Sequence, residues 1–136
     1  MLARLIVVVA LAACSRSEPA QPAASGSASV AKPQVVKDPA KAKQMIAGGA
    51  VVLDVRTTDE FSGGHLPTAT NVPIDEFQTR LPEVEQLAKG NKSQPIVVYC
   101  ARGGRAERAK QALEAAGYTN VVNGGGLDDL QQGADK

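Results

Sequence analysis

Short apolar runs, each followed by a segment with helical spacing, recur along the chain from residue 51 onward. The runs at residues 51–55 (VVLDV), 96–99 (IVVY) and 120–123 (NVVN) are rich in β-branched residues and too short for helices, which is typical of buried parallel strands. Residues 106–116 instead place alanine and leucine at helical spacing, and Gly117 follows as a stop signal. This alternation predicts an α/β fold with a central parallel sheet flanked by helices on both faces.

Capping and turn residues predict the remaining elements. Asp38 and Pro39 suit the start of a short helix that glycines end at 48–49, and Thr57 with Glu60 has the spacing of a capping box. Residues 63–73 are interpreted as a loop with a short strand.

Two further segments complete the pattern. Helical material is expected from Asp75, interrupted by Pro82 and ended by Gly90, and a last helical turn is expected at 127–130. In parallel α/β sheets the functional site lies beyond the carboxyl ends of the strands. The residues that follow each strand are therefore the candidates for chemistry.

The segment after the run at 96–99 has the most distinctive chemistry. Cys100 ends the strand, and the next five residues combine two glycines with two arginines before the helix begins. Glycine permits positive φ, so successive amide N–H groups can converge on one point, to which the helix N-terminus adds its own donors. An anion would be held there, and the thiolate form of Cys100 would be favoured. The expected substrate-binding residues are Ala101, Arg102, Gly103, Gly104 and Arg105.

A less specific interpretation of Cys100 is a buried small hydrophobic residue at a strand end. The glycines and arginines have no packing rationale, however, and they favour a reactive thiol. Arg102 and Arg105 each have the alternative of being a solvated surface charge.

Composition and charge limit the class of protein. The 136 residues include 43% hydrophobic residues but no Trp, two Phe and two Tyr, so the core must consist mainly of Val, Leu, Ile and Ala. Lys and Arg number 15 against 14 Asp and Glu, and Arg4 lies in the leader described next. A chain so close to neutral has no basic field for nucleic acid, and no nucleic-acid partner is expected.

The N-terminal region has the pattern of an export signal. Residues 1–13 combine Arg4 with an apolar run too short to span a bilayer, and the sequence at 11–14 (LAAC) resembles a bacterial lipobox in which Cys14 is acylated. We expect a lipoprotein-type signal peptide at 1–13, a disordered Ser/Ala/Pro-rich tether at 14–34, a domain at 35–132 and a tail at 133–136. The protein would then be anchored on the periplasmic side of a bacterial membrane. The alternative is a plain secretory peptide and a soluble periplasmic protein.

Three blocks of residues in this order resemble a known family. They are DVR at 54–56 followed by EF at 60–61, GHL at 64–66, and the Asn and Pro at 71 and 73; the Cys100 loop; and GGL at 125–127. The chain is similar to single-domain rhodaneses, which are sulfurtransferases, and in particular to small periplasmic phage-shock rhodaneses. Two departures are Thr68–Ala69 in place of the usual Gly-Ala and Leu130 in place of a Trp, which implies a different local turn and a smaller plug under the sheet.

This resemblance implies a rhodanese-like domain whose Cys100 accepts a sulfane sulfur from a small anionic donor such as thiosulfate. The persulfide would pass its sulfur to a thiophilic acceptor, either cyanide or a thiol. The loop amides with Arg102 and Arg105 would hold the donor and the persulfide. Neither a cofactor nor a metal is expected.

Asp54, Arg56, Glu60 and His65 are interpreted as supporting residues. Paired charges are usually structural, so the first three are expected to hold loops through hydrogen bonds and an ion pair. His65 has no second metal-ligand type nearby in the sequence, and a structural hydrogen bond is favoured over a catalytic base.

Two other functions remain as alternatives. Phosphatases and arsenate reductases with related anion cradles place an Arg six residues after the Cys, whereas Arg105 is the fifth residue after Cys100, and the shorter loop suits a smaller anion. A non-catalytic module that binds sulfur or a partner is the second alternative, because a fold alone does not license activity. We expect a monomer, since no long apolar stripe is left over for a partner.

Overall fold

A four-stranded parallel sheet organises residues 34–132, the part of the chain that this computed structural model describes. Its spatial order is β2-β1-β3-β4. The bounds are Val51–Asp54 for β1, Ala69–Asn71 for β2, Ile96–Cys100 for β3 and Val121–Gly126 for β4. The predicted signal peptide, tether, Cys14 and tail lie outside the described residues. Because all four strands run in one direction, their carboxyl ends share one edge of the sheet.

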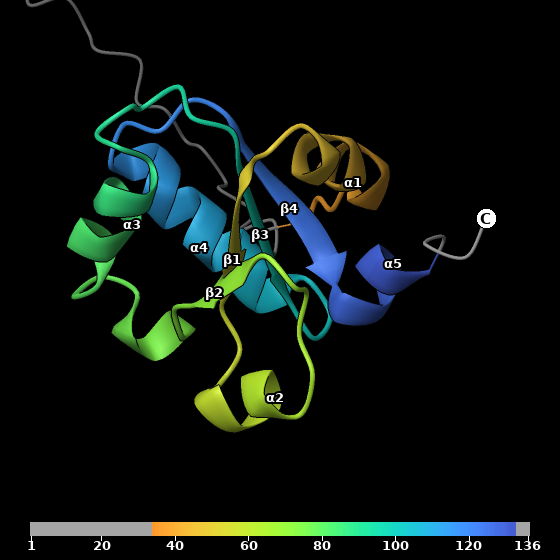
Figure 1. Cartoon of the computed structure of the whole chain (residues 1–136). Coiled ribbons are helices and arrows are strands. Elements are labelled where there is room, and N and C mark those ends of the chain that lie inside the picture. The colour runs from red at the N-terminus through yellow and green to blue at the C-terminus, as the bar shows by residue number, and fades with distance from the viewer. Residues whose placement is uncertain (1–33, 133–136) are drawn as a thin grey trace, which may run out of the picture. The chain divides into compact units, whose positions relative to one another are not determined.

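Helices cover both faces of this sheet, as the sequence predicts. Figure 1 shows α1 and α5 on one side of the strands and α3 and α4 on the other, with α2 beyond the strand ends. The bounds are Pro39–Ala47 for α1, Thr58–Ser62 for α2, Leu81–Leu87 for α3, Gly104–Ala115 for α4 and Leu127–Gln131 for α5, with a 3₁₀ turn η1 at Ile74–Glu76. Among these helices of residues 34–132, none has the length and apolar character needed to cross a bilayer.

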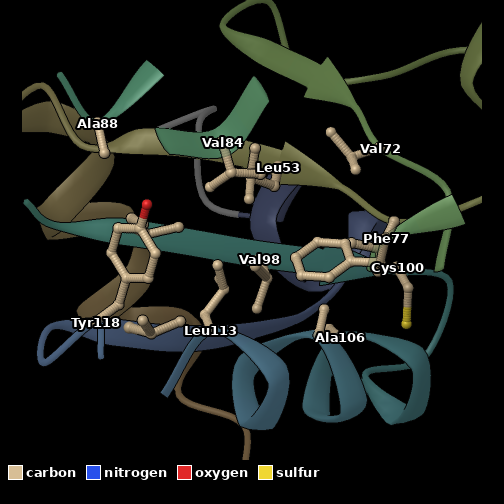
Figure 2. Close-up of a cluster of buried hydrophobic side chains, with 14 residues drawn as sticks. Leu53, Val72, Phe77, Val84, Ala88, Val98, Cys100, Ala106, Leu113 and Tyr118 are labelled. Carbon is tan, nitrogen blue, oxygen red and sulfur yellow. The ribbon is translucent and has the colours of Figure 1, made fainter. Parts of the chain in front are cut away.

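Alternation along β3 divides the core between the two faces. Ile96, Val98 and Cys100 join a cluster with residues of η1, α3 and α4, whereas Val97 and Tyr99 join one with α1 and α5. Figure 2 shows the first cluster, with Cys100 at one end and its sulfur directed toward the first turn of α4. The two-residue period of the strand thus fixes which helix the thiol faces.

The predicted caps are confirmed. The Asp38 carboxylate accepts a hydrogen bond from the Lys41 N–H at 2.9 Å, with Pro39 following it as the first residue of α1. Thr57 and Glu60 form the capping box of α2, in which each side chain accepts from the other residue's backbone N–H.

Two elements differ from the sequence prediction. Pro82 does not interrupt one helix but lies in the first turn of α3, where a missing N–H costs nothing. The last strand is longer than the predicted 120–123, because Gly124, Gly125 and Gly126 continue in β4 instead of forming a loop. Position 126 pairs with Cys100 across a register shift, which brings the end of β4 to the thiol.

Candidate active site

Cys100 is the last residue of β3 and its thiol is almost enclosed. The residue is 1% exposed, and the backbone N–H of Gly103 donates to its sulfur at 2.9 Å. Helix α4 begins one residue later, at Gly104, so its unpaired N–H groups and dipole lie beside the sulfur. The Gly103 N–H and the helix N-terminus thus both direct positive charge toward the sulfur.

A cavity of about 410 Å³ opens above this sulfur. Its lining residues are Cys100, Ala101, Arg102, Gly104 and Arg105. Five of the six predicted loop residues therefore surround one space. The sixth, Gly103, is buried beneath them with a φ of 100°, a left-handed conformation that glycine adopts without strain.

The two arginines of the loop have different environments. Both terminal nitrogens of Arg105 donate to the Glu60 carboxylate, at 2.7 and 2.9 Å, which joins α4 to α2. This pairing lowers the pKa of Glu60 from 4.5 to about 2 and raises the pKa of Arg105 above its usual value. Arg102 is exposed, and within residues 34–132 no carboxylate forms an ion pair with it.

Asp54 and Arg56 form a buried ion pair at the end of β1. The Arg56 Nη2 lies 2.7 Å from one Asp54 oxygen and donates also to the Gly64 carbonyl at 2.6 Å, and its pKa is raised chiefly by the Asp54 hydrogen bond. Neither residue lines the cavity. The pair holds the loop after α2 through the Gly64 carbonyl.

His65 lies outside the cavity lining and is exposed. Its ring stacks on Phe61 with the centroids 3.7 Å apart, and its Nδ1 is 2.8 Å from the Phe61 carbonyl oxygen. That contact assigns the proton to Nδ1, because a carbonyl only accepts. In residues 34–132, His, Cys, Asp and Glu side chains form no group of three or more that could hold a metal ion.

The backbone at the end of β4 packs directly against the cysteine loop. A Cβ at Gly126 would lie 2.4 Å from the Ala101 carbonyl oxygen, so only glycine permits this approach. The sequence prediction placed the glycine run at this edge but missed two buried polar residues behind it, Glu107 and Asn123. Each of these residues interrupts an apolar pattern, which is the one sign of them in the sequence. Glu107 does so beside the alanine face of α4, and Asn123 does so within the last strand.

Comparison with known proteins agrees with this geometry. The model of the rhodanese-like domain matches residues 38–132. The thiosulfate sulfurtransferase PspE of Escherichia coli strain K12 is 35% identical over 78 residues, which cover 57% of this chain and 71% of PspE.

Relatives with another activity also carry similar sequence. The tRNA uridine(34) hydroxylase of Enterobacter sp. strain 638 is 32% identical over 78 residues, but these are 56% of this chain and only 22% of the hydroxylase. Among solved structures, one described as a rhodanese with anions from E. coli superimposes with a TM-score of 0.53 at 32% identity, covering 60% of this chain and 91% of that one. Fold, cysteine loop and sequence therefore agree, and the chain belongs to the rhodanese family.

Proposed function

We propose that this protein is a thiosulfate sulfurtransferase in which Cys100 is the nucleophile. One observation carries the proposal: an enclosed sulfur accepts a backbone N–H and opens into a cavity lined by two arginines. A nucleophilic thiolate beside anion-stabilising groups is what transfer from an anionic sulfur donor requires.

The reaction proceeds in two displacements. The Cys100 thiolate attacks the sulfane sulfur of thiosulfate, the S–S bond of the donor breaks, and sulfite leaves with the electron pair. The resulting persulfide then loses its outer sulfur to cyanide or a thiolate, which returns the Cys100 thiolate. The loop N–H groups stabilise the negative charge on the sulfur in each intermediate state, so the chemistry needs no cofactor.

Arg102 and Arg105 contribute differently to donor binding. The Glu60 carboxylate already neutralises Arg105, so this guanidinium mainly shapes the cavity wall. Arg102 is the cation available to the sulfonate of the donor, and removing its charge should raise KM for thiosulfate more than it lowers kcat.

Intact mass of the purified protein before and after thiosulfate tests this function. We expect a gain of one sulfur atom that cyanide removes, in the wild type and not in Cys100→Ser. A sulfur that persists in Cys100→Ser would assign the transfer to another group. No adduct on the wild type would reject thiosulfate as donor and favour the non-catalytic module.

We infer from the N-terminal sequence that Cys14 is acylated and holds the domain on the periplasmic side of a membrane. The support is the short apolar run and the LAAC sequence at 11–14. Mass spectrometry of the mature N-terminus tests this inference: a diacylglyceryl cysteine is expected, and an unmodified N-terminus beyond Cys14 would contradict it.

A further inference from the structure

Two buried polar side chains lie behind the cysteine loop and have no part in the displacements described above. Asn123 of β4 is 1% exposed and Glu107 of α4 is 8% exposed. The Asn123 Nδ2 donates to a Glu107 carboxylate oxygen at 3.0 Å, and within residues 34–132 no cation pairs with that carboxylate. The side-chain partners of this buried carboxyl group are the amides of Asn123 and, at 3.5 Å, of Gln111, and burying it with no cation beside it costs free energy.

The same Asn123 amide holds the loop. Its Nδ2 also donates to the Gly103 carbonyl at 3.0 Å, and its Oδ1 accepts from the Gly125 N–H at 2.9 Å. The orientation of the amide follows from these partners, because a carboxylate and a carbonyl only accept and an N–H only donates. Glu107 therefore selects the orientation in which Nδ2 faces Gly103.

The direction of the Gly103 carbonyl determines where the next N–H group, that of Gly104, points. This oxygen accepts from Asn123 and from the Glu107 N–H of α4 at 2.9 Å, so both of its lone pairs are used. In a planar trans peptide the C=O and the following N–H point in opposite directions. The bond that draws the Gly103 carbonyl toward β4 thus turns the Gly104 N–H away from β4, and Gly104 lines the cavity.

We propose that Asn123, oriented by its partners Gly103, Gly125 and Glu107, is a positioning residue that aims the Gly104 N–H at an anion above the sulfur. The proposal rests on the function proposed above, in which the cavity receives an anionic donor. It assigns to β4 a share of the donor selectivity of the site, although no β4 side chain lines the cavity.

The test separates this role from ordinary stabilisation. In Asn123→Asp the carboxylate still accepts from Gly125, but it faces both the Gly103 carbonyl and Glu107 without a proton to donate. Adding Glu107→Gln removes the repulsion between two carboxylates and restores a hydrogen bond between the two side chains, with donor and acceptor exchanged. Only the bond to Gly103 stays absent. Glu114→Gln, on the exposed side of α4, is the matched control for loss of a carboxylate.

Two properties are measured on the full chain. One is the thermal unfolding midpoint. The other is the rate of Cys100 alkylation by iodoacetate divided by the rate with iodoacetamide, followed by mass spectrometry of the Cys100 peptide. The ratio compares an anion with a neutral reagent of similar size, so it reports how well the cavity receives negative charge, whether or not sulfur is transferred.

We expect the double variant to regain most of the midpoint that Asn123→Asp loses while its ratio stays about tenfold below the wild type, as for loss of one positioned donor to an anion. Glu114→Gln should keep the wild-type ratio. A ratio that recovers together with the midpoint would overturn the proposal, since Asn123 would then act only on stability. A wild type whose ratio equals that of free cysteine would also overturn it. Failure of the thiosulfate test with the expected ratios would leave the positioning role intact and reject only the donor.

Discussion

At Gly126 the backbone of β4 passes the Ala101 carbonyl at a distance that no side chain tolerates. The first residue after Cys100 is thus held by a strand residue that lies more than twenty positions away in the sequence. Gly103, with its φ of 100°, provides the complementary bend on the other side of the contact. The shape of the cysteine loop depends on direct backbone contact between β4 and Ala101. A single added methyl group is enough to separate these two segments.

Gly126→Ala should therefore displace the loop. A Cβ 2.4 Å from a backbone oxygen forces a shift, with a destabilisation of about 1–3 kcal/mol and at least a tenfold loss in the rate of persulfide formation. Urea unfolding and the thiosulfate mass assay measure the two effects. Gly48→Ala is the control, because its φ is −83° and its Cβ would make only ordinary contacts, so a change within about 0.5 kcal/mol is expected. Equal effects of the two substitutions would contradict this account.

Sequence reasoning identified the site residues that act within one continuous segment. It missed the site residues whose contacts join distant segments. Cys100 and its loop are recognisable because strand, glycines and helix start are consecutive. Asn123 and Glu107 meet each other across 16 positions and Asn123 reaches Gly103 across 20, and neither has a local pattern that indicates a buried pair. The bidentate contact between Arg105 and Glu60 spans 45 positions, which no spacing rule covers.

Among the elements, α2 is joined to α4, the helix that follows the cysteine loop, by the contact between Glu60 and Arg105. The depressed pKa of Glu60 makes this contact depend on pH. A carboxyl group whose pKa falls from 4.5 unfolded to about 2 folded stabilises the native state above pH 4.5. That contribution disappears as the pH falls from 4.5 toward 2, where the group becomes protonated in both states.

Glu60→Gln should lower stability at neutral pH by about 1 kcal/mol, a value kept small because water screens this partly exposed pair. The difference from the wild type should persist down to about pH 4.5 and shrink toward zero near pH 2. Thermal unfolding midpoints from pH 7 to 2 measure it. As a control, Glu83→Gln removes the ion pair of Glu83 with Arg80 at the start of α3, which has no partner near the site. A difference that grows on acidification would contradict the assignment.

The starts of helices could be predicted from the sequence where the capping residues are close together along the chain. Asp38 with Pro39, and Thr57 with Glu60, determine the starts of α1 and α2 without help from the rest of the fold. The glycines after Asn123 suggested a loop because glycine is a poor strand former in isolation. Their strand conformation depends on β3 and the cysteine loop beside them, which is tertiary information.

At the scale of the whole molecule, residues 35–38, which precede α1, make contacts that hold the domain together. Lys37 pairs with Asp129 at 2.9 Å, Val35 lies against Gly103, and the Asp38 N–H donates to the Asn123 carbonyl at 2.8 Å. Residues 35–38 thus connect the start of the domain to the cysteine loop, β4 and α5.

A fragment that begins at Gln34 should unfold at the same temperature as the full chain, whereas one that begins at Pro39 should lose about 1–2 kcal/mol. The shorter fragment lacks the Asp38 cap and the bond to Asn123. Scanning calorimetry of the two fragments measures the difference. Identical midpoints would show that residues 34–38 contribute nothing to the fold.

The parallel order β1-β3-β4 also has a consequence for timing. Synthesis delivers Cys100 before β4, yet the loop needs the close approach of Gly126 and the amide of Asn123 to take its shape. Until the last strand has docked, the chain holds an ordinary cysteine on an incomplete sheet. Under the function proposed above, a chain whose β4 has not docked lacks the loop shape that sulfur loading requires, so it holds no sulfur to release to a wrong acceptor.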